Sequence, residues 1–421
     1  MTVRVNKRMA RFANDSVTVM NGVDESGVSV YLSKGGRRVL GGSSNPEGGS
    51  LERFLGVLYK SLLSLPKDPK HVPLPPRAWS FSPRPDHDKG LGSEGLVADS
   101  AMEAISSARG AGARRSAGSV ETSVLSHYLL TSNGTVGRET SAKALLNVRA
   151  FTSKDASGHG LSCSSSARDF RPGEAGRTAG EHAKRMANAK QPEEGEYSVL
   201  MNPTVAANLL SLLGEFASAF SVEAGTSCLT GKVGKKVASE EVTLIDHGKT
   251  PGCLEGRTFD DEGQPTQSTT VIGKGILKGY LHNISTAKRF KTKTTGNAGI
   301  IDPGPWNLEV AAGDSTYEEM VSEMKKGVVL TSNWYTRFKN MRTGEFSTVP
   351  RDGAYLVEGG KVKGPLRGMR LTDTLGRMFS SVRMLSKERE WVQWWEVDTP
   401  TKCPWVLADG VSISRAYGGA P

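Results

Sequence analysis

The spacing of apolar residues predicts a helix between Leu51 and Leu65. Within this segment apolar side chains recur every three or four residues, which places them on one face of a helix. They are Leu51, Phe54, Leu55, Leu58 and Leu62. The proline-rich residues 65–85 that follow cannot continue regular structure, because proline lacks the backbone N–H. We therefore expect a helix followed by a long loop.

Runs of apolar and β-branched residues on either side of this helix predict strands. Gly35-Gly36 separates two such runs, and a Gly-Gly pair suits the tight turn of a hairpin. Asn133-Gly134 marks another turn, and Gly110 ends a predicted helix. The expected strands are 16–20, 28–33, 37–42, 123–132 and 144–153, and the expected helices are 99–113 and 172–190. This mixture predicts an α+β domain in which helices accompany a sheet.

A polar break at Gln191 to Tyr197, QPEEGEY, predicts a domain boundary. Before the break helices and strands alternate. After it short strands dominate, separated by glycine turns such as Gly359-Gly360. We therefore predict two domains within an α+β fold class. The N-terminal sheet-and-helix domain spans 1–192, and the C-terminal domain, 193–421, is mostly antiparallel β with a few helices.

Two helices are expected in the second domain. In the stretch NPTVAANLLSLLGEF, Asn202 can cap the free N–H groups and Pro203 fits the first helical position. The apolar residues of this helix fall on one face, which predicts that it packs in a core. They are Val205, Leu209, Leu212, Leu213, Phe216 and Phe220. The second helix is indicated by Ser315 and Glu318 at capping-box spacing, with its end at Gly327.

Composition indicates the size class and the cellular compartment of the protein. The chain has 421 residues, enough for two or three domains with cores of their own. Its four cysteines lie far apart without a CxxC pair, which fits neither a disulfide framework nor a structural zinc site. The sequence shows no signal-peptide core and no apolar run that could span a membrane. We therefore expect a cytoplasmic protein in a reducing compartment, without membrane contact.

The formal net charge of +10 at pH 7 is gathered partly in one stretch. Residues 273–293 carry lysines and arginines with no acidic residue between them. An acidic partner such as nucleic acid is one interpretation. The stretch offers few aromatic residues for base stacking and no nucleic-acid-binding motif, so a solvated face or a subunit contact is the better interpretation. Nucleic acid is therefore an unlikely partner.

The helix of a zinc peptidase needs two histidines one turn apart and a glutamate beside the first, which activates the bound water. None of the seven histidines of this sequence has such a partner. His182 lacks one because Thr178 and Met186 stand four residues to either side, and we interpret it as a residue on a helix surface. A metal site built from distant residues stays open. The sequence predicts no metal ligand on this chain.

Two clusters could be taken for a nucleophile site or an anion site. His159 and Cys163 stand among serines and could act as base and nucleophile. Catalytic triads are assembled in space, however, and no nucleophile-elbow pattern surrounds these two residues. Residues 293–299, KTTGNAG, join a basic stretch to glycines but lack phosphate-loop spacing. No catalytic residue is predicted from either cluster.

An acidic cluster is formed by Asp260, Asp261 and Glu262, followed by Gly263. Adjacent carboxylates can hold a hard cation or accept hydrogen bonds from backbone N–H groups in a turn. Calcium loops need alternating oxygen ligands over a longer segment, which this spacing does not supply. We therefore predict a structural turn or a dimer contact at this cluster.

Several segments occur in an order that resembles one known family. They are GKVGKKVASE, FDDEGQPTQSTTVIGKGILKGYLHNISTAKRF, TTGNAG, YEEMVSEMKKGVVLTSNWY, TGEFS and GAYLVEGGKVKGPL. Together they closely resemble the TldD/PmbA peptidase family, and within it the PmbA (TldE) branch. The resemblance covers nearly all of the second domain. The first domain, with RFANDSVTV, GGRR and LLTSNG, is similar more loosely.

The resemblance implies a two-domain cytoplasmic chain that pairs with a TldD-type subunit. In this family such a pair forms a metalloprotease that trims or degrades unfolded peptides. The TldD-type subunit carries an HExxxH helix, and the corresponding segment here reads ANLLSLLGEF, without ligands. A further family ligand, a cysteine in a glycine-rich segment, has no equivalent, since Cys403 lies in TKCPWV just ahead of the last predicted strand. The resemblance thus implies no cofactor on this chain and zinc on the partner.

The leading hypothesis from the sequence is a metal-free subunit of a heterodimeric peptidase, which completes the dimer and the substrate channel. An exposed strand edge could bind an extended peptide through main-chain hydrogen bonds. Candidates for the channel wall are Asn297, Asn333 and Trp334, where polar and aromatic side chains adjoin turns. The alternatives are a self-sufficient homodimeric hydrolase and a basic binding module for acidic partners or nucleic acid. Whether the chain is an enzyme on its own stays open.

Overall fold

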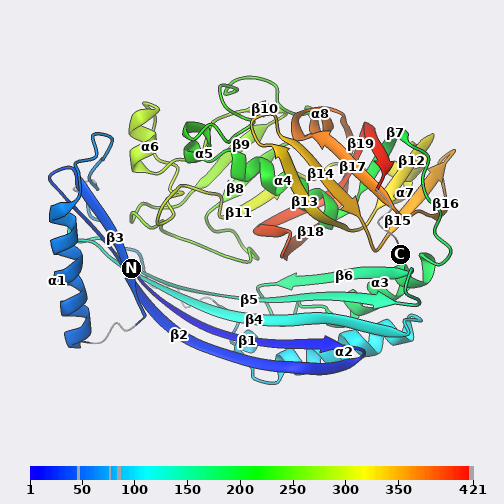
Figure 1. Ribbon diagram of the computed structural model, residues 1–421, viewed down its shortest axis with the longest axis horizontal. Helices are drawn as coiled ribbons and strands as arrows, with labels where there is room; N and C mark the ends of the chain where they lie inside the picture. Colours follow the sequence, from blue (N-terminus) through cyan, green and yellow to red (C-terminus); the bar gives the residue numbers. More distant parts are fainter. Residues whose placement is uncertain (45–47, 75–76, 83–86, 417–421) are drawn as a thin grey trace.

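The computed structural model describes residues 1–44, 48–74, 77–82 and 87–416. Two β-sheets organise this part of the chain (Figure 1). The first sheet has six strands and forms the curved lower layer in Figure 1, and the second has 13 strands and lies above it. Helices accompany both sheets, so the predicted α+β fold class is confirmed, with strands as the main component.

The six strands of the first sheet are antiparallel and lie in the order β3-β2-β1-β4-β5-β6. Helix α1 lies beside β3, and α2 and α3 pack together at the opposite end of the layer (Figure 1). The strands are Thr2–Ala13 (β1), Ser16–Lys34 (β2), Arg37–Ser43 (β3), Arg115–Leu130 (β4), Val136–Phe151 (β5) and Ser157–Ser164 (β6). The helices are Gly48–Ser64 (α1), the 3-10 helix Lys89–Gly92 (η1), Leu96–Gly110 (α2) and Pro172–Arg185 (α3).

Alternation along β5 shows that both faces of the first sheet are used. Side chains of successive strand residues point to opposite faces. The even-numbered residues from Ala142 to Ala150 are buried and apolar, and they form one core with α2 and α3. The odd-numbered Glu139, Lys143 and Arg149 instead pair with residues of the second sheet and its loops. The first sheet therefore has an apolar face for its helices and a polar face for the rest of the molecule.

Glycines let α3 approach β6 closely. A Cβ atom added to Gly158 would lie 2.1 Å from the backbone oxygen of Ala179, and one added to Gly160 would lie 2.0 Å from that of Ala175. Real Cβ atoms do not come so near, so only glycine fits these two positions without moving the helix. The face of β6 toward α3 is thereby closed, which leaves the opposite face and the outer edge of this strand for other contacts.

The second sheet is centred on β19, which pairs with β7, β11, β17 and β18. Most pairs in it are antiparallel, whereas β7 with β12 and β11 with β19 are parallel. Its strands are Gly195–Met201 (β7), Leu244–His247 (β8), Ser268–Gly273 (β9), Ile276–Leu277 (β10), Asn307–Val310 (β11), Lys326–Leu330 (β12), Asn333–Asn340 (β13), Glu345–Pro350 (β14), Ala354–Glu358 (β15), Lys361–Pro365 (β16), Met369–Thr374 (β17), Val382–Trp394 (β18) and Val397–Arg415 (β19).

Five helices accompany the second sheet in the described part of the chain, and all except α4 have six residues or fewer. They are Pro203–Phe216 (α4), Ala219–Glu223 (α5), Ile284–Arg289 (α6), Tyr317–Ser322 (α7) and Leu375–Ser380 (α8). Helix α4 lies against β19 and β18, and its apolar residues belong to the largest hydrophobic core of the molecule. None of the helices in the described part of the chain combines the length and apolar character needed to cross a bilayer.

Buried ion pairs join the first sheet to the second. The Arg149 guanidinium donates to Asp352 at 2.6 Å, and the Asp352 side chain is fully buried. The Glu139 carboxylate, 2% exposed, accepts from Arg257 Nε at 2.9 Å and from the Thr258 backbone N–H at 2.7 Å. Removing one partner of such a pair leaves an uncompensated buried charge, so these contacts tie the two halves firmly together.

Most locally encoded elements are confirmed, with two corrections. The Gly35-Gly36 and Gly359-Gly360 turns have positive φ angles and join hairpins as predicted. The capping box of α7 lies one residue later than predicted, at Thr316 and Glu319 instead of Ser315 and Glu318. The prediction that this helix ends at Gly327 is wrong, because α7 ends at Ser322 and Gly327 pairs within β12.

The predicted division at residues 191–197 coincides with a change of sheet. The first sheet ends with β6, α3 follows, and the second sheet begins with β7 at Gly195. Residues 191–194 form no regular element. Whether 1–192 and 193–421 fold as separate domains stays a prediction. Of the proline-rich segment, residues 75–76 and 83–86 lie outside the described residues.

Candidate functional site

Helix α4 begins as the sequence predicts. The Asn202 side chain accepts a hydrogen bond from the Val205 backbone N–H at 3.0 Å, and Pro203 occupies the first turn. Leu209 and Leu213 are at most 1% exposed and Phe216 is 7% exposed, so the apolar face of the helix is core. Leu212, in contrast, is only partly buried and packs at the margin of that core. The prediction that Phe220 shares the core face is wrong, because α4 ends at Phe216 and Phe220 lies in α5 with 44% of its surface exposed. The middle of α4 is therefore a packing element.

A buried network of neutral polar groups surrounds the middle of α4. The Asn208 amide oxygen accepts from Asn333 Nδ2 at 2.8 Å and from the Thr336 hydroxyl at 2.6 Å. The Asn208 amide nitrogen donates to the carbonyl of Glu396. Thr348 joins the network through Thr336 at 2.8 Å and through Asn333 at 3.1 Å. These amides and hydroxyls bond to one another, as buried polar groups usually do. The exception is the Asn333 amide oxygen, which is buried without a hydrogen-bond partner among the described residues.

The side chains around α4 do not fit a zinc ion. Protein ligands of zinc are thiolates, imidazoles and carboxylates, usually three or four of them. The polar groups on the buried side of α4 are the Thr204 hydroxyl, the Asn208 amide and the Ser211 hydroxyl, which donates to the Asn208 carbonyl at 3.2 Å. Glu215, partly buried, is the one carboxylate on this helix. Across the described ranges, no group of three or more His, Cys, Asp or Glu side chains could hold a metal ion. Cys403 is buried inside β19, not ahead of it as predicted.

Asn333 and Trp334, two predicted channel residues, lie at the start of β13 and are buried. Asn333 is 0% exposed, and Trp334 is 9% exposed and packs against Trp394 at 5.1 Å between ring centroids. The rings that reach solvent here are Tyr335 and Trp395, at 50% and 46% exposure. Their centroids lie 5.8 Å apart. The channel role of Asn333 and Trp334 stays a prediction, and the structure places them beneath an exposed aromatic pair.

Asn297, the third predicted channel residue, is also buried. Its amide nitrogen donates to Asp246 at 2.6 Å and to the carbonyl of Gly304 at 3.0 Å. Burial raises the pKa of Asp246 to about 7, although the backbone N–H groups of Trp306 and Asn307 also donate to this carboxylate. Asn297 thus holds the turn before β11 in place, and a direct role in a channel stays a prediction.

The carboxylates of the acidic cluster each find a separate donor. Asp260 accepts from the backbone N–H groups of Glu262 and Gln264, and Glu262 accepts from that of Ile284 at 2.8 Å. Asp261 pairs with Arg257 at 2.8 Å. Gly263 has a φ of +76°, which suits glycine at the end of this turn. The contacts describe a structural turn, and a role in a dimer contact stays a prediction.

The segment around His159 and Cys163 forms β6. Burial lowers the pKa of His159 to about 4 and raises the pKa of Cys163 to about 12. His159 bonds to Asn147 at 2.8 Å and to Ser332 at 3.1 Å, whereas the Cys163 thiol contacts the backbone of Gln393. A neutral imidazole and a protonated thiol with separate partners do not form a nucleophile and base.

His182 is not the exposed helix residue that the sequence suggested. Its ring is half-buried, and Nδ1 lies 2.6 Å from the hydroxyl of Tyr355 on β15. Burial and the neighbouring Arg185 lower its pKa to about 4. No local pattern indicates this contact, because Tyr355 follows 173 residues later.

A cleft of about 840 Å³ opens between the two sheets. Residues 159–164 of β6 and the loop 165–171 line one side, and the first turn of α4 lines another together with residues 390–392 of β18. Lys402 and Trp405 of β19 complete the wall. The volume lies within the range of ligand-binding sites in proteins. Neither β6 nor β18 was predicted from the sequence, so the cleft is the main feature that sequence reasoning missed.

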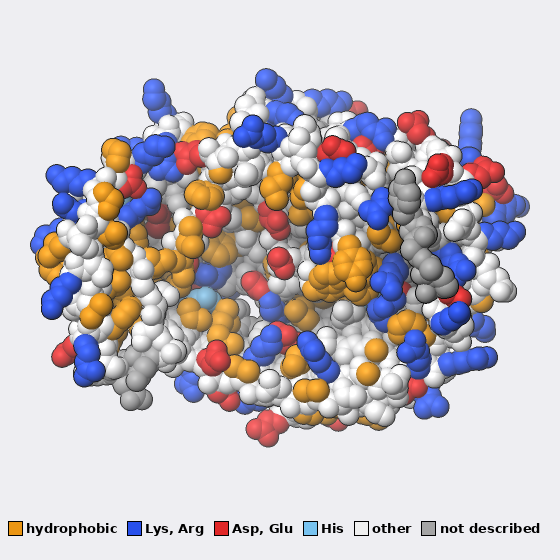
Figure 2. All heavy atoms as spheres, viewed as in Figure 1, with side chains coloured by type: hydrophobic (Ala, Val, Ile, Leu, Met, Phe, Trp, Pro, Cys, Tyr) orange, Lys and Arg blue, Asp and Glu red, His pale blue; other side chains and the backbone are white. Residues whose placement is uncertain are grey.

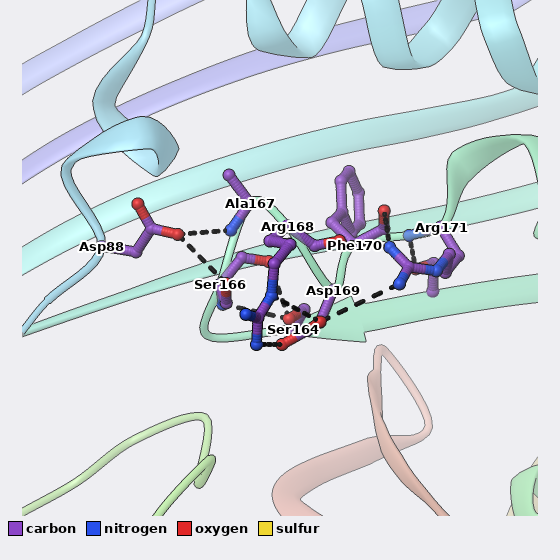
Figure 3. A network of polar contacts seen from close by, with 9 residues as sticks. Asp88, Ser164, Ser166, Ala167, Arg168, Asp169, Phe170 and Arg171 are labelled. Atoms are coloured by element: carbon purple, nitrogen blue, oxygen red, sulfur yellow. Dashed lines mark hydrogen bonds and ion pairs between the residues drawn. The ribbon is translucent and has the colours of Figure 1, made fainter.

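The loop at the rim of this cleft is held by Asp88, as Figure 3 shows. The Asp88 carboxylate accepts from the Ala167 backbone N–H at 2.8 Å and from the Ser166 hydroxyl at 3.1 Å. The backbone N–H groups of Gly90 and Ala167 lower the pKa of Asp88. Beyond this anchor, Arg168 extends with 87% of its side chain exposed. The backbone of the rim loop is thus held in place by Asp88, and charged side chains cover its surface.

The charges that line the cleft are balanced. Basic side chains come from the rim loop and from β19, and acidic ones come from the same loop, α3 and β18. The basic residues are Arg168, Arg171 and Lys402, and the acidic residues are Asp169, Glu174 and Glu390. Elsewhere Lys and Arg side chains are spread over the whole face seen in Figure 2. In the basic stretch, Arg289 is paired with Glu223 at 2.6 Å.

Residues 194–415, more than half of the chain, match the family model of the PmbA/TldA metallopeptidase C-terminal domain. The chain therefore belongs to the PmbA/TldD family of metallopeptidases. It is 31% identical over 218 residues to a metalloprotease of Methanocaldococcus jannaschii, covering 49% of this chain and 47% of that protein. A metalloprotease TldD homolog of Haemophilus influenzae is 29% identical over 171 residues, covering 39% and 35%. The chain thus matches about half or less of the length of these relatives.

The likeness to solved structures extends over the whole fold. TldE from Thermococcus kodakarensis superposes with a TM-score of 0.85, covering 98% of this chain and 95% of that chain at 21% sequence identity. At this identity the likeness shows the fold alone. The first half, which lies outside the matched family model, therefore has the same arrangement as in a solved protein of this fold.

Proposed function

We propose that this chain is the TldE-type, zinc-free subunit of a two-subunit metallopeptidase that trims or degrades unfolded peptides. Its partner is a TldD-type subunit, which supplies the zinc. The observation that carries the proposal is the set of side chains that α4 offers in place of metal ligands. Where a zinc peptidase needs two imidazoles one turn apart beside a carboxylate, this helix has one carboxylate, Glu215, but no imidazole, and it otherwise presents leucines, the Asn208 amide and the Ser211 hydroxyl. No step of bond cleavage is assigned to this chain.

The names of the relatives support the pairing. The chain is similar in sequence to a TldD homolog and in fold to a TldE. A chain of this family that lacks the zinc ligands can still function by shaping the substrate channel of a partner subunit that carries those ligands. The exposed rings of Tyr335 and Trp395, held from below by Trp334, offer apolar contact area to a passing peptide. Asn333 serves this channel by holding the backbone beneath these rings, and Asn297 serves it by holding the turn before β11.

Metal analysis combined with an activity assay tests the proposal. The purified chain should contain no stoichiometric zinc and should cleave no unstructured peptide. Addition of a purified TldD-type subunit should give cleavage that a chelator abolishes. The matched control is the TldD-type subunit alone, which should cleave less than the mixture.

Three results would contradict this proposal. One tightly bound zinc ion per isolated chain would contradict the donor-set argument. Chelator-sensitive cleavage by the isolated chain would favour the self-sufficient homodimeric hydrolase instead. Cleavage by the TldD-type subunit that is unchanged by this chain would remove the proposed role in the channel.

A further inference from the structure

A second pocket, of about 470 Å³, lies between the first sheet and the turn that joins β18 to β19. Residues of β1, β4 and β5 form its floor, and residues 393–395 and 397–398 form its roof. The contact of the Cys163 thiol with the backbone of Gln393 closes the cleft at this end and separates it from the pocket. The volume lies within the range of sites for small ligands. We call this cavity the Trp394 pocket.

The floor of the Trp394 pocket presents a row of three polar side chains. Arg11 of β1 stands opposite Ser119 of β4, and Ser119 stands opposite Asn147 of β5. Directly opposite residues of neighbouring strands share a face of the sheet. Asn147 is an odd-numbered residue of β5, so the row lies on the polar face. The exposed Arg11 guanidinium has no hydrogen-bond or ion-pair partner in the described part of the chain, which leaves its charge available to a ligand.

The amide of Asn147 is oriented by His159. Burial lowers the pKa of His159 to about 4, so its ring is neutral at pH 7. The Nε2–H of this ring donates to the Asn147 amide oxygen at 2.8 Å, because a carbonyl oxygen can only accept. Nδ1 then accepts from the Ser332 hydroxyl at 3.1 Å. The Asn147 amide nitrogen has no acceptor among the described residues, so its two N–H groups are available to a ligand.

Two indole rings form the roof of the Trp394 pocket. Trp394 is 6% exposed, and its Nε1–H is buried without a hydrogen-bond partner among the described residues. Trp395 is 46% exposed, and the two ring centroids lie 5.8 Å apart. Aromatic rings favour edge-to-face or offset contacts with a further ring, and a buried donor without an acceptor is uncommon. The roof therefore offers aromatic surface and an unused N–H.

An acidic group stands at the edge of this roof. Asp398 is exposed and has no cation or hydrogen-bond donor as a partner within the described ranges. Glu121 on the floor is instead paired with Lys7 at 2.6 Å. The charge of Asp398 acts on Glu215, whose pKa is raised to about 7 by burial and then by Asp398. This neighbour adds no positive charge, so the Asp398 carboxylate is available to a ligand cation.

We propose that the Trp394 pocket binds a free aromatic amino acid as a zwitterion. The carboxylate of the ligand pairs with Arg11 and accepts from the Asn147 amide, its ammonium group pairs with Asp398, and its ring packs against Trp395. Arginine binds carboxylates through two charge-assisted hydrogen bonds. A zwitterion neutralises both unpaired charges of the pocket at once, whereas the charged ends of a longer peptide are separated by the residues between them. The inference depends on neither zinc nor a TldD-type subunit.

Three ligands that differ in their charges test the site on the isolated full chain. At pH 7 L-phenylalanine carries both charges, 2-phenylethylamine lacks the carboxylate, and 3-phenylpropanoate lacks the ammonium group. Binding is measured by isothermal titration calorimetry. L-Phenylalanine should bind saturably. Each analogue should bind about tenfold or more weakly, because one hydrogen-bonded charge is missing from the ligand.

Two variants assign each charge to its residue. Arg11→Gln should weaken binding of L-phenylalanine about tenfold and leave binding of 2-phenylethylamine within about twofold, since that ligand has no carboxylate. Asp398→Asn should weaken L-phenylalanine similarly and leave 3-phenylpropanoate within about twofold. The matched control is Arg4→Gln, which removes an exposed arginine of β1 outside the pocket and should change none of the three affinities. Circular dichroism checks that the variants fold.

Three outcomes would overturn the inference. Absence of saturable binding of L-phenylalanine would show that the pocket is not an amino-acid site. Equal affinity for the three ligands would show that neither charge is recognised, and this test uses the unaltered chain. An Arg11→Gln variant that binds L-phenylalanine as well as the parent does, or that loses 2-phenylethylamine to the same extent, would show that Arg11 does not hold the carboxylate.

Discussion

The middle of α4 and the cleft beside its first turn use polar groups in opposite ways. Around Asn208, amides and hydroxyls bond to one another and are sealed from water. In the cleft, the outward main-chain groups of β6 and β18 have no neighbouring strand within the described ranges. One helix contributes to both places, since Asn202 and Thr204 line the cleft while Leu213 is in the core. Polar groups that satisfy one another hold a structure together, whereas those left open to solvent can hold a ligand.

The largest expected effect on stability comes from substitutions in the buried part of α4. Leu213→Ala should lower the free energy of unfolding by about 2–5 kcal/mol, because Leu213 is 1% exposed and its loss leaves a cavity. Leu212→Ala is the matched control on the same helix, and it should cost less because Leu212 is only partly buried. Urea unfolding measures both. Equal costs would show that α4 does not pack by one face.

Removing the centre of the polar network should have a smaller effect. Asn208→Ala deprives Asn333 and Thr336 of an acceptor and the Glu396 carbonyl of a donor. We expect a loss of about 1–3 kcal/mol in the free energy of unfolding, the usual cost of buried groups left unpaired. Ser211→Ala, which removes only a bond to a carbonyl of its own helix, should cost less. If the two variants were equally stable, the network would have no structural role.

The rim of the cleft allows a still finer comparison. Asp88→Ala should cost about 1 kcal/mol, similar to the loss of a helix cap, because it releases the N–H groups of Gly90 and Ala167. Arg168→Ala should leave stability unchanged, since its side chain is 87% exposed. Hydrogen exchange at the Ala167 amide should accelerate in the first variant only. Acceleration in both would mean that Asp88 is not the anchor of the loop.

The last comparison concerns pH. Burial, and to a lesser extent Asp398, raise the pKa of Glu215 on α4 from 4.5 to about 7. The folded chain therefore binds this proton more tightly than the unfolded chain does, and the contribution of Glu215 to stability falls as the pH rises from about 4.5 to about 7. Glu215→Gln should flatten this slope, measured as the urea midpoint at several pH values. An unchanged slope would mean that Glu215 is ionised in the folded chain as readily as in the unfolded one.

Local signals explain what the sequence could predict. The Gly35-Gly36 turn and the Asn202 cap depend on neighbouring residues, and both are found where expected. The capping box of α7 was misplaced by one residue because Ser315 with Glu318 and Thr316 with Glu319 have the same spacing. Only the structure shows that Thr316 receives the N–H of Glu319. Local patterns thus fixed the type of element better than its boundary.

The candidate site was harder to predict, because its parts meet only in the folded chain. The closed end of the cleft joins Cys163 to Gln393, which are 230 residues apart. β18 escaped prediction since charged residues interrupt it and its pairing with β19 shifts register between Leu385 and Arg389. β1 was not predicted for the first of these reasons, because lysine and arginine interrupt its apolar residues. An open edge is a property of the assembled sheet, and a single strand pattern does not show it.

The central place of β19 has a consequence for synthesis on the ribosome. The six strands of the first sheet have all been made by Ser164, so this sheet can close while the rest of the chain is still being translated. The strands β7, β11, β17 and β18 must wait for residues 397–415, which join them. A cleft with one wall from each sheet is therefore among the last features to form. A nascent chain has no completed groove in which to trap its own unfolded segments.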